Sequence, residues 1–221
     1  MSTSIQFLFD YISPYAYLAW TQLPKLARRH GCSVEPIPVL FAGLLNANGQ
    51  LGPAEVPSKR VYVFKDAMRS AHNLGLPLVP PPTHPFRPLL SLRVSCLETL
   101  GEQRWRVIDS LFHATWGSGA GVETGEQVSA VLANLGLDPT DIIAQASTVK
   151  IKQRLRDNTA QAIAAGVFGV PTMLIGGELF WGYDSFGHID RFLSGKEALD
   201  TTLVQRWIDI RATAERRRER R

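Results

Sequence analysis

The stretch FLFDYISPYAYLAW, residues 7–20, decides the fold of this chain. Its first residues are apolar and predict a short buried strand. Pro14 suits the first turn of a helix, because the amide that proline lacks would have no partner there. The pattern therefore predicts a strand, a turn and a helix that ends before Gly31. Ser13 would stand at the start of that helix, near its free backbone amides and the positive end of its dipole.

A second stretch, GVFGVPTMLIGGELFWGYD at residues 166–184, predicts a β-hairpin. Two glycines at residues 176–177 separate two short apolar runs, which is a strong signal for a two-residue turn. A proline that opens a strand stands either at its first position or after a cis peptide bond. The sequence leaves both alternatives open for Val170-Pro171. Asp184 precedes a further predicted helix, where it either caps that helix or receives a charged ligand.

The segments between these stretches predict a helical insertion. Residues 34–41 contain two prolines and predict an edge strand parallel to the first strand. Residues 42–57 contain Gly, Asn and Pro and predict a loop at the rim of a site. From there to the hairpin, apolar residues recur at three- and four-residue spacing, which predicts helices. We therefore expect an α/β fold in which residues 1–45 and 160–221 form one discontinuous domain. An all-helical insertion, residues 46–159, would split it.

The composition excludes several classes of protein. The hydrophobic share of 45% and the charged share of 20% are those of a globular chain. No apolar run approaches the roughly 18–20 residues of a membrane span, and no leader-like segment opens the chain, so we expect a cytoplasmic protein without a membrane partner. The net charge is +4, but residues 212–221 hold five Arg against two Glu. This favours a solvated tail over a nucleic-acid partner. Cys32, Cys96 and five scattered histidines predict packed thiols and no metal site.

Ser13 is the central candidate for chemistry. A helix start that faces an X-Pro turn is the arrangement of a thioredoxin-like fold. The usual Cys-x-x-Cys position there holds SPYA, residues 13–16, so dithiol chemistry is excluded and any thiol must come from another molecule. Ser13 is either an ordinary N-cap or a hydroxyl that stabilises a thiolate and lowers the pKa of its thiol. No histidine motif offers it a base, so a Ser-His mechanism has no support.

The two stretches, at their spacing, resemble the 2-hydroxychromene-2-carboxylate isomerase family. That family is similar to kappa-class glutathione transferases and, more distantly, to bacterial disulfide oxidoreductases with a helical insertion. The resemblance extends from about Ile5 to Leu193. It implies a glutathione-dependent enzyme for a small aromatic substrate, in which a thiolate adds transiently to a conjugated enone. Homodimers are common among such proteins, so a homodimer is one arrangement that the resemblance allows.

The resemblance also implies roles for single residues. Ser13 would hydrogen-bond the glutathione sulfur, and Val170 and Pro171 would pair with the tripeptide backbone. The γ-glutamyl end would be held by Trp181, Gly182, Tyr183 and Asp184.

The substrate end departs from the family pattern. A lysine of the family's substrate loop aligns near Leu45, so no cation matches it. Lys59 and Arg60 are candidates for a substrate carboxylate, or else the solvated first turn of a helix. His84 either walls the aromatic pocket or lies in a connecting loop. Two other functions stay open: a kappa-like glutathione transferase for another electrophile, and a thioredoxin-like binding protein without catalysis.

Overall fold

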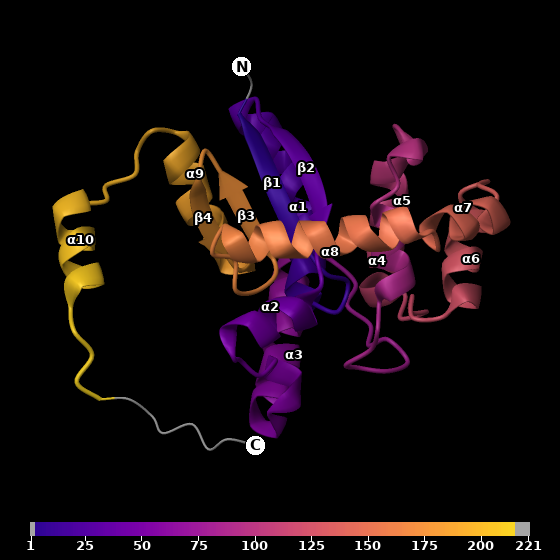
Figure 1. Ribbon diagram of the computed structural model, residues 1–221, viewed down its shortest axis with the longest axis horizontal. Coiled ribbons are helices and arrows are strands. Elements are labelled where there is room, and N and C mark those ends of the chain that lie inside the picture. The colour runs from indigo at the N-terminus through magenta and orange to yellow at the C-terminus, as the bar shows by residue number, and fades with distance from the viewer. Residues whose placement is uncertain (1–2, 215–221) are drawn as a thin grey trace.

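The computed structural model describes residues 3–214, and Figure 1 shows their arrangement. The strands are β1 (Ser4–Phe9), β2 (Ser33–Pro38), β3 (Thr172–Ile175) and β4 (Glu178–Trp181). The α-helices are α1 (Pro14–His30), α2 (Phe41–Asn48), α3 (Pro57–Leu74), α4 (Leu89–Ser95), α5 (Gln103–Phe112), α6 (Gly125–Asn134), α7 (Pro139–Ala146), α8 (Val149–Ala164), α9 (Phe186–Leu193) and α10 (Thr201–Asp209). Short 3-10 turns lie at Pro53–Glu55, Glu98–Leu100 and Tyr183–Ser185, and a π-helical turn at His113–Gly117.

The strands form one sheet in the order β2-β1-β3-β4. β1 runs parallel to β2 and antiparallel to β3, and β3 pairs antiparallel with β4. The predicted strand-helix-strand unit, the edge position of the proline-containing strand and the hairpin are thereby confirmed. Gly176 and Gly177 have φ values of 61° and 92°. A two-residue hairpin turn requires such values, which glycine adopts without a steric penalty.

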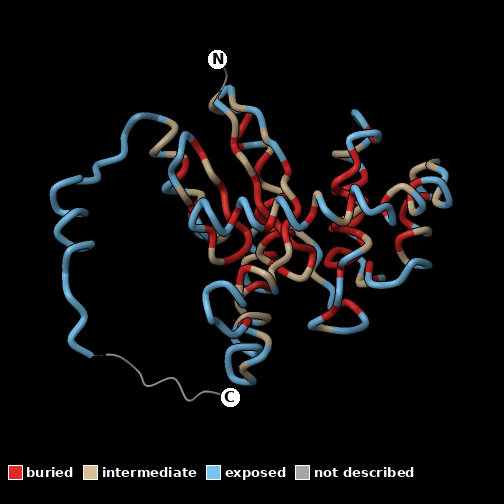
Figure 2. Tube along the Cα trace, viewed as in Figure 1, coloured by how far each residue is buried: buried red, intermediate tan, exposed pale blue. Residues whose placement is uncertain are grey.

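The side chains of β1 alternate between the two faces of the sheet. Phe7 and Phe9 join a large core with α1 and the insertion helices. Leu8 points to the opposite face and packs in a smaller cluster with Leu44 of α2 and Ala162 of α8. Figure 2 shows these buried segments running through the centre of the molecule. The sheet therefore has helices on both faces, as a thioredoxin-like α/β fold requires.

The helical insertion shares the core of the sheet. Phe112 of α5 contacts Phe9 and Tyr11, with ring centroids 5.3 Å and 4.7 Å apart. Trp105 of the same helix stacks on Trp20 of α1 at 4.0 Å. The α/β class with an inserted set of helices is confirmed. The division into residues 1–45 with 160–221 and residues 46–159 stays a prediction, and its two limits fall within α2 and α8.

Residues 42–57 contain helix α2 and a 3-10 turn, so the prediction of a loop there is wrong. The first backbone amides of α2 have acceptors from distant parts of the chain. The amide of Leu40 donates to Oγ1 of Thr159 at 3.0 Å, and that of Phe41 donates to Oδ2 of Asp10 at 2.9 Å. Because distant residues satisfy these amides, the start of α2 has no local capping residue, which is the signal that normally marks a helix start in a sequence.

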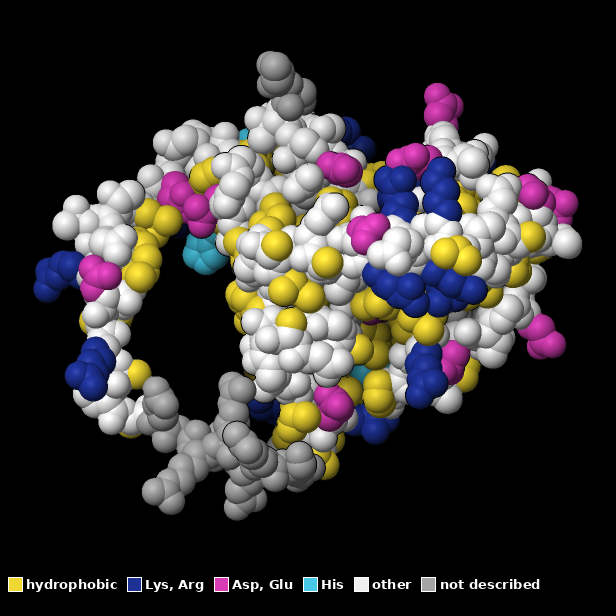
Figure 3. Space-filling view, viewed as in Figure 1, with side chains coloured by type: hydrophobic (Ala, Val, Ile, Leu, Met, Phe, Trp, Pro, Cys, Tyr) yellow, Lys and Arg dark blue, Asp and Glu magenta, His cyan; other side chains and the backbone are white. Residues whose placement is uncertain are grey.

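Helix α10 stands apart from the sheet at the end of an extended segment (Figure 1). None of its residues is buried, and Trp207 and Ile208 are each 69% exposed. In Figure 3 its hydrophobic side chains lie uncovered on this arm. None of the helices in residues 3–214 has the length and apolar character to cross a membrane. Most of the Arg-rich tail, residues 215–221, lies outside the described residues.

Candidate active site

Ser13 caps helix α1. Its backbone is extended, with φ −95° and ψ 117°, and its Oγ accepts a hydrogen bond from the amide of Ala16 at 3.2 Å. The side chain is only 8% exposed. Ser13 is therefore the N-cap of α1, and its role toward a thiolate stays a prediction. The same geometry places a shielded hydroxyl at the positive end of the α1 dipole.

The hydroxyl hydrogen of Ser13 has a weak partner. Oγ donates to the carbonyl of Val170 over 3.5 Å, whereas O–H···O bonds are usually about 2.7–2.8 Å long. A stronger acceptor near Oγ would accept this hydrogen bond instead, and only the weak bond to the Val170 carbonyl would be lost. The site therefore offers a hydrogen-bond donor to an incoming anionic atom.

The peptide bond between Val170 and Pro171 is cis, which settles the alternative that the sequence left open. The carbonyl of Pro171 accepts a hydrogen bond from the amide of Gly182 at 2.9 Å. This turn lies opposite Ser13, although 157 positions separate Ser13 from Val170. The two stretches that predicted the fold therefore meet at one place.

Residues 181–184 continue from β4 around the same corner. Gly182 has φ 90°, and a Cβ at this position would lie 2.4 Å from Oδ1 of Asp184. Only glycine lets the Asp184 carboxylate fold back this closely over the chain. Helix α9 has Ser185 at its cap position without a side-chain cap bond, so Asp184 does not cap it. Within residues 3–214 the exposed Asp184 carboxylate makes no hydrogen bond or ion pair, which leaves it available to a ligand.

Tyr15 connects the site to helix α3. Its hydroxyl donates to Oδ2 of Asp66 at 2.7 Å. Burial and the neighbouring Asp66 raise the pKa of Tyr15, with smaller contributions from Tyr62 and Asp184. Tyr15 therefore stays a neutral donor, and the charge of Asp184 acts on it. Asp66 therefore contacts Tyr15 directly, and Asp184 lies near enough for its charge to act on it.

Asp10 is a site residue that sequence reasoning missed. It is 3% exposed, and its Oδ1 accepts from the amide of Ile12 at 3.1 Å. Its Oδ2 bonds the amide of Phe41 at the start of α2. Burial raises the pKa of Asp10 from 3.8 to about 6, although both amide bonds act in the other direction. Asp10 therefore ties the turn before Ser13 to helix α2. The available signal was a lone charged residue inside the apolar run 7–12.

The three weaker substrate candidates differ in their surroundings. Lys59 and Arg60 are exposed on the first turn of α3. His84 is half-buried, and its Nε2 bonds the carbonyl of Ile12 at 3.0 Å. Burial lowers the pKa of His84, and the charge of Arg60 adds to this effect. The structure thus brings Arg60 and His84 near the site, and it places Leu45 within α2.

The two cysteines of the chain are packed, as predicted. Cys96 is 2% exposed, and burial raises its pKa to about 11. Burial also raises the pKa of Cys32. Neither thiol therefore forms a thiolate readily at neutral pH.

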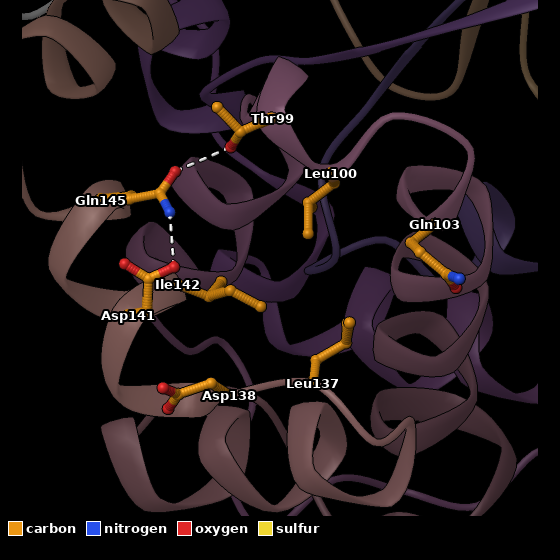
Figure 4. A pocket seen from close by; sticks show the side chains of 8 residues that line it. All are labelled: Thr99, Leu100, Gln103, Leu137, Asp138, Asp141, Ile142 and Gln145. Atoms are coloured by element: carbon orange, nitrogen blue, oxygen red, sulfur yellow. Dashed lines mark hydrogen bonds between the residues drawn. The ribbon is translucent and has the colours of Figure 1, made fainter.

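A pocket of about 250 Å³ lies in the insertion, lined by residues between Thr99 and Gln103 and between Leu137 and Gln145 (Figure 4). Thr99 donates to Gln145 at 2.7 Å, and Gln145 donates to Asp141 at 2.8 Å. Asp138 caps helix α7. The polar side chains that line this pocket are therefore engaged with the protein itself, and none of the predicted site residues lines it.

Comparison with known proteins first defines the class. The sequence profile described as the DSBA-like thioredoxin domain matches residues 4–194. The 2-hydroxychromene-2-carboxylate isomerase of Sphingobium xenophagum is 30% identical over 196 residues, which cover 87% of this chain and 99% of that protein. Glutathione S-transferase kappa 2 of Caenorhabditis elegans is 28% identical, covering 77% of this chain and 80% of that protein.

A solved structure of a 2-hydroxychromene-2-carboxylate isomerase superposes with a TM-score of 0.77 at 27% sequence identity. The superposition covers 95% of this chain and all of the other. The chain therefore belongs to the DSBA-like thioredoxin domain family and, within it, to the 2-hydroxychromene-2-carboxylate isomerases. It is an enzyme of the isomerase type.

Proposed function

We propose that this enzyme is a glutathione-dependent isomerase that converts 2-hydroxychromene-2-carboxylate to trans-o-hydroxybenzylidenepyruvate. The substrate name comes from its relatives, and the kappa-class relative supports glutathione as the cofactor. The observation that carries the proposal is the Ser13 hydroxyl. It stands at a helix start where thiol-dependent relatives of this fold have cysteine, and its hydrogen is held only weakly by Val170.

The residues around Ser13 fit a thiol-containing tripeptide. The Ser13 hydroxyl is an available donor for sulfur, and the Gly182 turn leaves no room for a Cβ beside the Asp184 carboxylate. When bound, glutathione would supply a thiolate that adds reversibly to the conjugated enone formed when the chromene hemiketal opens. The former double bond would then be single and able to rotate before the thiolate leaves again. No thiol of the chain takes that place, because Cys32 and Cys96 are packed and their pKa values are raised.

Each residue of the site has a separate task in this proposal. Ser13 donates to the sulfur, and the α1 dipole further favours the anion, so that the thiol ionises near neutral pH. The backbone of Val170 and Pro171 pairs with the extended tripeptide. Trp181, Gly182, Tyr183 and Asp184 hold its γ-glutamyl end, where the Asp184 carboxylate can receive the ammonium group.

The substrate carboxylate is assigned to the start of α3. Arg60 is the better candidate than Lys59, because its charge already acts on His84 beside the Ser13 turn. Arg60 is exposed and can move toward a ligand at little cost. Its guanidinium would bind a carboxylate through two parallel hydrogen bonds.

A kappa-type glutathione transferase is the second candidate function, which the 28% identical relative supports. The two functions differ in their products. An isomerase returns glutathione unchanged, whereas a transferase consumes it and releases a conjugate.

The test is turnover of 2-hydroxychromene-2-carboxylate with glutathione, with S-methylglutathione and without either. We expect turnover only with glutathione, and an unchanged glutathione concentration at the end. S-methylglutathione should bind but not support turnover, because its sulfur cannot ionise. Equal turnover without glutathione would overturn the proposal that glutathione is the cofactor. A glutathione conjugate as product would favour the transferase.

A further inference from the structure

Two successive backbone carbonyls just before Ser13 are held by side chains of the helical insertion. The carbonyl of Tyr11 accepts a hydrogen bond from Nε1 of Trp116 at 2.8 Å. The carbonyl of Ile12 bonds Nε2 of His84 at 3.0 Å. Trp116 thus holds the peptide between Tyr11 and Ile12, and His84 holds the next one, between Ile12 and Ser13.

This geometry determines the tautomer of His84. A carbonyl oxygen only accepts, so Nε2 must carry the hydrogen and, in the neutral ring, Nδ1 has the lone pair. Nδ1 is buried and has no hydrogen-bond partner within residues 3–214. Protonation there would create a buried N–H without an acceptor, which is unfavourable. Burial and the charge of Arg60 accordingly lower the pKa of His84, against the bond to Ile12. His84 is therefore a neutral donor to Ile12 at neutral pH.

Aromatic neighbours fix the plane of the His84 ring. Phe64 of α3 meets the ring edge-on with centroids 4.9 Å apart, and Trp116 lies 5.7 Å away. Phe86 packs on it at 6.2 Å. Trp116 is itself 1% exposed. The two donors thus contact each other and form one unit with little freedom to turn.

We propose that His84 is a positioning residue whose Nε2–H holds the Ile12 carbonyl, so that the Ser13 hydroxyl faces the thiol of the bound cofactor. The proposal rests on the proposed function, and it replaces the direct substrate contact that the sequence suggested for His84. Without this donor only the amide of Ser13, which donates to the carbonyl of Asp10 at 3.2 Å, still holds the Ile12–Ser13 peptide. The peptide then has more freedom to turn, and the Ser13 Oγ moves with it. Loss of the donor should then weaken the stabilisation of the thiolate, although His84 does not touch the sulfur.

Three variants separate the donor from the packing of the ring. His84→Phe keeps an aromatic ring among Phe64, Phe86 and Trp116 but removes the N–H. His84→Gln keeps an N–H at the same number of bonds from Cβ as Nε2. His84→Asn places its N–H one bond closer to Cβ than Nε2 of histidine. His72→Phe, on the exposed side of α3, is the matched control.

The measurement is the pKa of the thiol of bound glutathione, followed by thiolate absorbance against pH, together with urea unfolding of each variant. We expect His84→Phe and His84→Asn to raise the pKa of the bound thiol by about one unit or more, which is at least a tenfold loss of thiolate stabilisation. His84→Gln and His72→Phe should stay close to the wild type. If His84→Phe does not fold, the comparison of Gln with Asn gives the same test.

Two outcomes would overturn the proposal on its own. One is a lower free energy of unfolding for His84→Phe with an unchanged pKa of the bound thiol, which would leave His84 a structural role only. The other is an equal pKa shift in the Gln and Asn variants. If the wild type itself neither binds glutathione nor lowers the pKa of its thiol, the proposed function fails as well.

Discussion

Asp10 puts an ionisable carboxyl directly behind the turn that carries Ser13. Its pKa is raised to about 6 in the folded protein, from 3.8. The unfolded chain therefore loses this proton at lower pH than the folded protein does. The contribution of Asp10 to stability is fully present below pH 4 and is lost as the pH rises through 6.

Replacement of Asp10 tests this pH dependence. We expect the free energy of unfolding of the wild type to fall by up to about 3 kcal/mol between pH 4 and pH 7 from this residue alone. Asp10→Asn should remove that slope, because asparagine does not ionise. The variant also loses one of the two bonds to backbone amides, which changes its net stability but not the slope. Urea unfolding at a series of pH values measures the slope. Glu126→Gln, at an exposed position, is the control, and a slope unchanged in Asp10→Asn would contradict the assignment.

Single residues differ in how far sequence predicts them. Ser13, the Val170-Pro171 turn and residues 181–184 stand in two continuous stretches with local signals, and the structure brings those stretches together. Asp10 and Trp116 act through bonds to the backbone of distant segments, which no local pattern records. The sequence makes His84 a candidate for the wall of the substrate pocket or for a connecting loop, and it does not predict the bond to the Ile12 carbonyl.

Helix α2 shows the same limit at the scale of an element. Its sequence, rich in Gly and Asn, has no capping residue of its own, since Leu40 stands at the cap position. Strands and helices with local signals, such as the Gly-Gly hairpin and α1, were predictable. A helix whose first amides are satisfied by Asp10 and Thr159 was not.

Thr159 of α8 is the element-scale test. Its Oγ1 accepts from the amide of Leu40 and donates to the carbonyl of Leu155 at 2.8 Å. Thr159→Val should lower the free energy of unfolding by about 1–3 kcal/mol, because it leaves the amide of Leu40 without its acceptor. Thr159→Ser keeps the hydroxyl and should cost less. Denaturant unfolding of both variants is the measurement. No loss in Thr159→Val, or a loss in Thr159→Ser as large as that in Thr159→Val, would contradict the role of the hydroxyl.

At the scale of the whole molecule, the insertion packs against the sheet and holds the turn that precedes Ser13. It shares a core with the sheet through Phe112 and Trp105, and it supplies both donors to the turn before Ser13. The sequence predicted helices in this region but not their contacts. The reason is that helical periodicity reports which face is buried and not what covers it.

Helix α10, in contrast to the insertion, contributes no buried residue to the core. No residue of α10 is buried, so a chain that ends after Gly195 should keep its free energy of unfolding within about 1 kcal/mol of the full chain. Its affinity for glutathione should also be unchanged. Urea unfolding and sedimentation of both chains test this. A loss of several kcal/mol would contradict the exposed position of α10. A dimer that dissociates on truncation would show that α10 packs against a second copy, whereas the homodimer as such stays a prediction.

We propose that the Ser13 hydroxyl stabilises the thiolate of bound glutathione. The most direct measurement is the pKa of that bound thiol in the wild type, in Ser13→Ala and in Ser118→Ala, where the exposed Ser118 serves as control. We expect a pKa in the wild type well below the value of about 8.5 for a free cysteine thiol. Ser13→Ala should raise it by about one unit or more and slow turnover by roughly 10–1000-fold. An equal pKa and an equal rate in Ser13→Ala and the wild type would contradict the claim.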